Sequence, residues 1–255
     1  TLQLALGGRT HTGWWQARLE PARHRLLLQV SEGLHPALPA VMAGVRALFD
    51  LDADPAAIHQ TLGRHFPGGE ALRVPGAVDG FELAVRAVLG QQVTVAAART
   101  LAARLVEHFG APIETGDAAL TRLFPTPGAL AHASSDALGR LGIVRQRQGA
   151  IQALARAMAE GALDLSPHAD VPATLQALQA LPGIGDWTAQ YIAMRALRWP
   201  DAFPAGDVAL HKALGVQECK HPAREAEAIS LAWKPWRSYA VVRAWSAGRV
   251  APHTG

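Results

Sequence analysis

The sequence has little cysteine, lacks a long apolar run and has no large excess of charge of either sign. Its single cysteine, Cys219, excludes an internal disulfide bond, and it also excludes a cysteine-ligated zinc ion or an iron–sulfur cluster built by this chain alone. No apolar run approaches the roughly 20 residues that a membrane helix needs. The first residues, TLQLALGGRT, lack the basic flank and long apolar stretch of a secretory signal. We therefore expect a protein of a reducing compartment without a membrane span.

The composition is that of a globular protein. Of the 255 residues, 49% are hydrophobic and 18% are charged, and one or two domains are expected. Lysine and arginine number 24 against 21 acidic residues, a formal net charge of +3. This charge permits a polyanionic partner but is too small to demand one. The chain starts at Thr1 rather than at a methionine, so we expect a fragment of a longer protein or a chain without part of its natural N-terminus.

The first part of the chain has the alternating pattern of β-strands. Residues 2–6, 12–21 and 24–31 are strand candidates, and helical spacing runs from residue 36 to residue 50. Three short strands cannot bury a face alone, so the helix is expected to cover the sheet. We predict a small α+β domain over residues 1–78, with an antiparallel sheet and one helix.

The remaining residues, 79–255, are predicted to form an all-α domain. The helical spacing breaks at Gly90-Gln91-Gln92, where two helices are expected to meet at an angle. A later helix is predicted to begin with Ser135 or Asp136 as its cap.

The stretch LPGIGDWTAQY, residues 181–191, also interrupts the helical pattern. Apolar spacing stops at Pro182 and resumes beyond Gly185, which predicts a hairpin between two helices with Ile184 tucked between them. Gly183 and Gly185 leave the amides bare where the second helix presents the positive end of its dipole. The alternative is a simple connection between core helices. Because the stretch fits the pattern h-x-x-h-x-G-h-G-x-x-x-A, we predict that it binds a nucleic acid phosphate.

Aromatic side chains and one acid follow the hairpin. Trp187 and Tyr191 are four residues apart on the second helix, so their rings adjoin. Such a stripe is usually core, but beside a phosphate-binding turn it suits an unstacked base. Asp207 precedes a helical run and is expected to cap it. A carboxylate fixed in this way could stabilise the positive charge that develops at C1′ when a flipped nucleotide loses its base, or activate the attacking water.

Three separated segments carry a family likeness. LPGIGDWTAQY, FPAGD and WKPWRSYAVVRAW together resemble the HhH-GPD superfamily of DNA glycosylases, and within it the AlkA-type 3-methyladenine DNA glycosylases. The likeness covers nearly the whole chain. It implies a TATA-binding-protein-like N-terminal domain, followed by a helical domain whose two lobes flank the active-site cleft. It also implies hydrolytic removal of alkylated bases from double-stranded DNA by a monomer that requires no cofactor.

The resemblance assigns roles to the residues after the hairpin. Asp207 corresponds to the essential aspartate, and Trp187, Tyr191 and Trp245 correspond to the base pocket. Trp187 stands where strand-cutting members carry a lysine nucleophile, in a G-x-K-T-A context. Because tryptophan cannot form a Schiff base, lyase activity is not expected. Its π face would stabilise cationic bases such as 3-methyladenine and 7-methylguanine by about 0.5 to 2 kcal/mol.

The resemblance also assigns the DNA contacts. The amides of Gly183 and Gly185, with Thr188 nearby, correspond to the DNA-backbone anchor. Main-chain carbonyls near Leu181 and Gly183 correspond to a site for a structural monovalent cation. Gln92 aligns with the family's wedge, an apolar side chain that fills the gap left by the flipped nucleotide. Glutamine in place of leucine departs from the pattern, and the family's first strand and helix are missing from the chain.

Several points stay open at this level. Five basic residues are candidate phosphate contacts: Arg145, Arg147, Lys234, Arg237 and Arg243. A non-catalytic helix-hairpin-helix module that recognises DNA shape or damage is the alternative to an enzyme, and it would need neither Asp207 nor the pocket aromatics. A glycosylase domain within a larger adaptive-response protein is a third possibility. We expect a bacterial, cytoplasmic protein that acts on the nucleoid.

Overall fold

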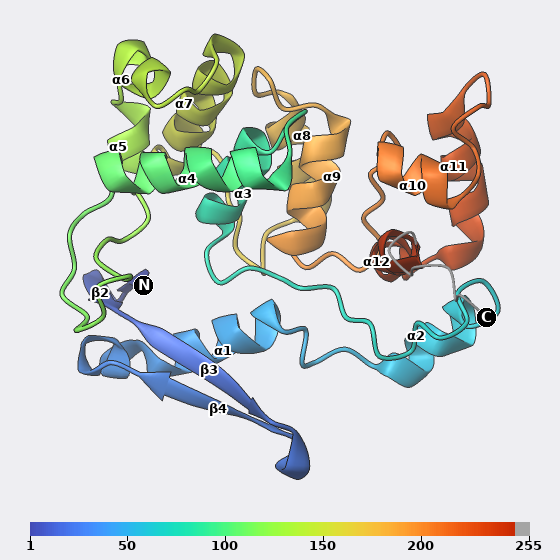
Figure 1. Cartoon of the computed structure of the whole chain (residues 1–255), viewed down its shortest axis with the longest axis horizontal. Helices are drawn as coiled ribbons and strands as arrows, with labels where there is room; N and C mark the ends of the chain where they lie inside the picture. The colour runs from blue at the N-terminus through green and yellow to red at the C-terminus, as the bar shows by residue number, and fades with distance from the viewer. Residues whose placement is uncertain (248–255) are drawn as a thin grey trace.

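The computed structural model describes residues 1–247, a small α+β region followed by a larger helical region (Figure 1). In this view the strands and the first helix lie below the helical region, which has two lobes. None of the helices within residues 1–247 has the length and apolar character needed to cross a bilayer.

The N-terminal region contains four short strands in two hairpins. β1 (Leu2–Leu6) pairs antiparallel with β2 (Arg9–Gly13), and β3 (Trp15–Glu20) pairs antiparallel with β4 (Arg25–Val30). The two hairpins form separate two-stranded sheets. The sequence predicted three strands and missed β2, because its residues, RTHTG, are polar and carry no apolar alternation.

One helix packs on these strands, as predicted. α1 (Leu38–Leu48) follows a 3-10 turn (Glu32–Ala37) and buries Val41 and Val45. These side chains form a small apolar cluster with Leu2 of β1. The cluster is separate from the core of the helical region.

A second helix, which the sequence analysis did not predict, joins the helical core. α2 (Pro55–Leu62) is capped by Asp54, whose carboxylate accepts hydrogen bonds from two amides of the first turn. Its buried residues Ile58 and Leu62 belong to the large core of the helical region. That core therefore draws on residues from both sides of the predicted boundary at residue 79.

The helical region begins with α3 (Gly80–Leu89) and α4 (Val95–Phe109), which are separated at the predicted break. In Figure 1, α3 to α9 form one lobe, and α10 to α12 form the other with α2 beneath them. The remaining helices are α5 (Pro127–Ala131), α6 (Ser135–Arg140), α7 (Arg145–Ala159), α8 (Val171–Gln179), α9 (Asp186–Arg195), α10 (Val208–Ala213), α11 (Pro222–Ser230) and α12 (Arg237–Ala247), with a 3-10 turn (Leu231–Trp233) after α11.

Polar N-caps set where several of these helices start. Asp79, Thr94 and Asp170 each accept hydrogen bonds from first-turn amides of α3, α4 and α8. The cap of α6 is Ser134, whose Oγ accepts from Ala137 N at 3.1 Å. The predicted caps of this helix, Ser135 and Asp136, are wrong by one and two residues, because both already lie within its first turn.

Candidate active site

Residues 180–185 connect α8 to α9 as a tight hairpin, as predicted. Ile184 is buried between the helices at 4% exposure. Gly183 has φ +80°, and a Cβ added there would lie 2.9 Å from Ala150 Cβ on α7. Gly185 has φ −85° and caps α9, and a Cβ added to it would meet no atom within 4 Å. Gly183 is therefore required by conformation and packing, whereas Gly185 leaves an open surface.

This difference predicts opposite tolerance at the two glycines. We expect Gly183→Ala to lower the free energy of unfolding by about 1 to 3 kcal/mol, because alanine is strained at positive φ and its Cβ overlaps Ala150. Gly185→Ala is the matched control and should cost less than about 1 kcal/mol. Chemical denaturation of both variants measures the difference. Equal losses would contradict the packing role of Gly183.

The N-terminus of α9 is open to an anion. Within residues 1–247 no side chain caps its first turn. The one acidic side chain of that turn, Asp186, is drawn toward α8, where its Oδ1 accepts from Gln179 Nε2 at 3.0 Å. The main-chain N–H groups at the start of α9, next to Gly185, therefore have no side-chain acceptor in the described part of the chain and can bind an anion.

The two carbonyls of the predicted cation site each accept one hydrogen bond within the protein. The Leu181 carbonyl accepts from Ile184 N at 3.2 Å, and the Gly183 carbonyl accepts from Gln91 Nε2 at 3.0 Å. A carbonyl oxygen has two lone pairs, so each of these oxygens can still face a cation, and the monovalent-cation site stays a prediction. Within residues 1–247 no group of three His, Cys, Asp or Glu side chains gathers to hold a metal ion through side chains. We assign no step to a cation.

Asp207 is held by donors from three helices. Its Oδ1 accepts from Leu210 N at 2.7 Å, which makes it the predicted N-cap of α10. The same oxygen accepts from Trp245 Nε1 of α12 at 3.0 Å. Its Oδ2 accepts from Trp187 Nε1 of α9 at 2.8 Å. The structure thus brings together three predicted site residues that are up to 58 positions apart in the chain.

Trp187 also begins an aromatic stack along α9. The Trp187 and Tyr191 rings are stacked, with centroids 5.4 Å apart and planes 9° apart. The Arg195 guanidinium lies 5.5 Å from the Tyr191 centroid. This stack borders a cleft of about 460 Å³ between α9 and the α3–α4 pair. Trp187 contributes to both the cleft and the Asp207 contacts, whereas Trp245 contacts Asp207 without lining the cleft.

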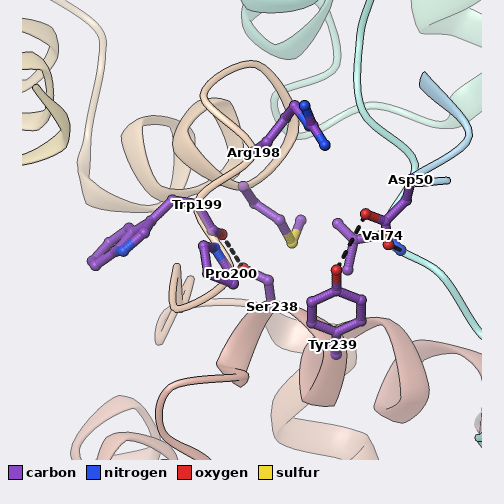
Figure 2. A pocket seen from close by; sticks show the side chains of 8 residues that line it. Asp50, Val74, Arg198, Trp199, Pro200, Ser238 and Tyr239 are labelled. Carbon is purple, nitrogen blue, oxygen red and sulfur yellow. Dashed lines mark hydrogen bonds between the residues drawn. The ribbon is translucent and has the colours of Figure 1, made fainter. Parts of the chain in front are cut away.

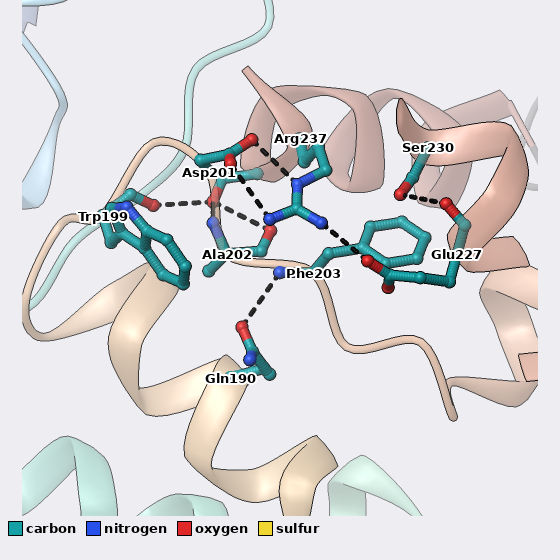
Figure 3. A network of polar contacts seen from close by, with 9 residues as sticks. Gln190, Trp199, Asp201, Ala202, Phe203, Glu227, Ser230 and Arg237 are labelled. Atoms are coloured by element: carbon teal, nitrogen blue, oxygen red, sulfur yellow. Dashed lines mark hydrogen bonds and ion pairs between the residues drawn. The ribbon is translucent and has the colours of Figure 1, made fainter. Parts of the chain in front are cut away.

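The loop that leads to Asp207 is fixed by α12 (Figure 3). Arg237 donates from Nε and Nη2 to the two carboxylate oxygens of Asp201, at 2.8 and 2.9 Å. Its Nη1 donates to Glu227 Oε1 at 2.9 Å. The prediction that Arg237 contacts phosphate is therefore wrong, because the side chain is buried and both its carboxylate partners lie within the protein.

Three further side chains hold the same loop, and the sequence predicted none of these contacts. Ser238 Oγ accepts from Ala202 N at 3.1 Å, and Gln190 Oε1 accepts from Phe203 N at 3.1 Å. His211 is buried, and its Nε2 lies 2.6 Å from the Ala205 carbonyl oxygen. Tertiary packing brings Ser238 and Gln190 to the loop, so no local pattern in the sequence identifies their contacts.

The other basic candidates differ in their surroundings. Arg145 and Lys234 are exposed, and Arg147 is half-buried, donating to the main-chain oxygen of Gln91. Arg243 is 2% exposed and, among residues 1–247, its guanidinium has no hydrogen-bond partner. Burial lowers the pKa of Arg243. The prediction that Arg243 contacts phosphate is wrong, because α12 points this side chain into the core near Glu70 rather than toward solvent.

A buried contact ties α12 to the segment after α1. Figure 2 shows the Tyr239 hydroxyl pointing at Asp50, whose Oδ1 accepts it at 3.2 Å. The other oxygen of Asp50 accepts from Val74 N at 3.1 Å. Burial, with the Asp50 charge, raises the pKa of Tyr239 far above its usual range. The helix that carries Trp245 is therefore anchored from outside its own lobe.

The break between α3 and α4 reaches the hairpin through a residue that the sequence analysis did not single out. Gln92, the predicted wedge, is exposed and has φ +52°. Its neighbour Gln91 is half-buried and donates to Gly183 O and to Thr188 Oγ1. Thr188 itself is buried at 3% exposure, so its hydroxyl bonds within the protein and only its main chain is available for the predicted DNA contact.

Two family models match the chain and together cover most of it. Residues 1–79 match the AlkA N-terminal domain, and residues 85–238 match the HhH-GPD superfamily base excision DNA repair protein model. The two matches adjoin near the start of α3.

Curated relatives and solved structures agree with these matches. The chain is 39% identical to DNA-3-methyladenine glycosylase 2 of Escherichia coli, over 88% of this chain and 77% of that protein. It is 42% identical to a probable bifunctional transcriptional activator/DNA repair enzyme AlkA of Mycobacterium tuberculosis, over 82% of this chain but 43% of that protein. A 3-methyladenine DNA-glycosylase from Archaeoglobus fulgidus has the same fold, with a TM-score of 0.79 at 21% identity, over 97% of this chain and 86% of that one.

Proposed function

Because the chain belongs to the HhH-GPD superfamily of base excision DNA repair proteins, we propose that it is a DNA-3-methyladenine glycosylase, an enzyme that removes alkylated bases from duplex DNA. The observation that carries this proposal is the Asp207 carboxylate, held by two indole N–H groups beside an aromatic cleft. A non-catalytic DNA-binding module would have no use for a carboxylate fixed by three donors.

The hairpin supplies the contact to the DNA backbone. The uncapped N-terminus of α9 offers main-chain amides and the positive end of the helix dipole to one phosphate. The open surface at Gly185 lets the backbone approach closely. Contacts of this kind set the register of the protein on the duplex without reading sequence.

Asp207 then acts on the flipped nucleotide through its charge. Loss of the base leaves positive charge at C1′, which a fixed carboxylate stabilises. A carboxylate has about four lone-pair positions, and three of them are taken here by Leu210, Trp245 and Trp187. This occupancy favours electrostatic stabilisation over proton abstraction from water as the role of Asp207.

The aromatic stack supports recognition of the base. A methylated purine carries positive charge and is attracted to the π face of an indole. Tyr191 lies between Trp187 and Arg195 at helical spacing, and Trp187 itself lines the cleft, where the base is proposed to stack on it. Because the indole stands where a lyase would need a lysine, the proposed reaction ends at base removal.

The proposal is tested by incubating the protein with methylated duplex DNA and measuring the released bases. The expected products are free 3-methyladenine and 7-methylguanine from a strand that stays intact until alkali is added. Absence of any released base would remove the enzymatic proposal, and strand cleavage without alkali would remove its hydrolytic form.

A substitution at Trp187 separates the rate of base release from the affinity for DNA. We expect Trp187→Phe to slow base release at saturating DNA by about 10-fold or more, because it keeps a ring but removes the hydrogen bond to the Asp207 carboxylate. Affinity for undamaged duplex should change much less. The control is Trp15→Phe, a half-buried tryptophan in β3. If DNA affinity falls further than the rate, Trp187 has a structural role instead.

A further inference from the structure

Gln91 joins the two surfaces that the proposed function places on DNA. Its side-chain nitrogen donates to the Gly183 carbonyl at 3.0 Å and to Thr188 Oγ1 at 2.9 Å. Gly183 lies within the hairpin, and Thr188 follows the hairpin in the first turn of α9. One side chain, 92 positions earlier than Gly183, therefore joins the hairpin to the first turn of α9.

The main chain of Gln91 is also held by a hydrogen bond. Its carbonyl accepts from the Arg147 guanidinium of α7. Helix α7 in turn packs against the hairpin, where Ala150 faces Gly183. The α3–α4 turn, α7 and the hairpin thus meet at one residue.

The residue after Gln91 is in a conformation that needs such support. Gln92 is exposed and lies in the left-handed region at φ +52°, where a residue with a Cβ is disfavoured. On its other side, Thr94 caps α4 through Ala97 N. The turn is therefore held at Gln91 and at Thr94, and Gln92 projects from between these two points.

We infer that Gln91 is a positioning residue, which holds the exposed turn at Gln92 at a fixed separation from the phosphate-binding hairpin. This inference rests on the proposed function, because it concerns the step in which the enzyme inserts a side chain as the nucleotide leaves the duplex. Without the amide, the hairpin still binds phosphate, but the turn is no longer coupled to it. Gln91 itself touches neither the base nor the sugar in this role.

The matched pair for the test is Gln91→Met and Gln152→Met. Methionine keeps the length of glutamine and removes the amide. Gln152 of α7 is also half-buried and also donates from Nε2 to a carbonyl of another segment, Ala133 O at 2.8 Å, away from the hairpin. Both variants therefore lose the same kind of hydrogen bond, and thermal unfolding should show that both remain folded.

Three measurements separate positioning from a general structural effect. With 2-aminopurine beside the methylated base, we expect Gln91→Met to lower the fluorescence change on flipping, and the single-turnover rate at saturating DNA should fall about 10-fold. Binding to undamaged duplex should be unchanged. Amide exchange of the protein without DNA should rise at residues 90–94 and 183–188. Gln152→Met should match the wild type in all three.

Other results overturn the inference. A Gln91→Met variant that flips the nucleotide and releases the base like the wild type removes the positioning role while leaving the proposed function intact. Equal loss of rate, DNA affinity and melting temperature in both variants reduces Gln91 to a structural residue. Should the wild type release no base, the proposed function fails, and amide exchange still decides whether Gln91 couples the turn to the hairpin.

Discussion

Replacement of Asp207 by asparagine should lower the single-turnover rate of base release by about 100- to 1,000-fold, the loss seen when one preorganised charge-stabilising group is removed. Asparagine keeps the shape of the side chain but removes the negative charge that faces C1′. Its Oδ1 can still accept from Leu210 N and Trp245 Nε1, but its amide nitrogen cannot accept from Trp187 Nε1, so one of the three hydrogen bonds that hold the group is lost as well. The measurement is the amount of 3-methyladenine released per enzyme in the first turnover.

The same change should leave folding and DNA binding intact. Asparagine caps helices about as well as aspartate, so the free energy of unfolding should fall only by the lost Trp187 hydrogen bond, about 0.5 to 1.5 kcal/mol. The control is Asp170→Asn, because Asp170 caps α8 with a hydrogen bond of 2.8 Å to Ala173 N and touches none of the site residues. A slow Asp170→Asn variant, or an active Asp207→Asn variant, would remove Asp207 from the chemistry.

The second large effect concerns Gly185. We expect Gly185→Asp to weaken binding to duplex DNA by at least about 10-fold at low salt, because it places a carboxylate where the phosphate is proposed to sit. The backbone at this position tolerates a side chain, with φ −85° and open space around the added Cβ. Aspartate is also a preferred N-cap, so the free energy of unfolding should stay the same or rise.

A loss of DNA affinity together with unchanged or higher stability would assign the effect of Gly185→Asp to the phosphate contact and not to unfolding. Gly128→Asp is the control, since Gly128 also lies in the first turn of a helix, α5, with no atom closer than 4.0 Å to an added Cβ. It introduces the same charge and should leave DNA affinity unchanged. Fluorescence anisotropy over a salt series measures both, and added salt should narrow the gap between the variants. Similar affinities for Gly185→Asp and wild type would move the anchor away from the hairpin.

The parts of the fold that could be predicted from the sequence are those with local signals. The hairpin at Gly183 and Gly185, the break before Gln92 and the cap at Asp207 each depend on residues within one or two helical turns, and all three are present. The rings of Trp187 and Tyr191 adjoin, as their spacing requires. Helix α2 was missed because its eight residues carry too short a pattern.

The parts that could not be predicted depend on which side of a helix faces the core in the tertiary structure. Arg237 and Arg243 lie near the motif in the sequence, but α12 directs both side chains into the core. The indole contacts to Asp207 join residues 20 and 38 positions away, which no spacing rule reaches. Gln92 was singled out because it aligns with the family's wedge, and no sequence pattern shows that its neighbour Gln91 is half-buried and bonded to the hairpin.

The contact between Tyr239 and Asp50 limits how recombination can exchange the two regions of this protein. Asp50 precedes α2, and α2 packs near the 3-10 turn that leads into α12, so the helix carrying Trp245 is supported by residues from well before residue 79. A recombination event that joined residues 79 onward to a foreign N-terminal region would discard both supports together. The region before residue 79 and the helical region after it therefore cannot be exchanged independently. Fusion to further domains is compatible with this packing only when the junction lies outside the block from Asp50 to α12.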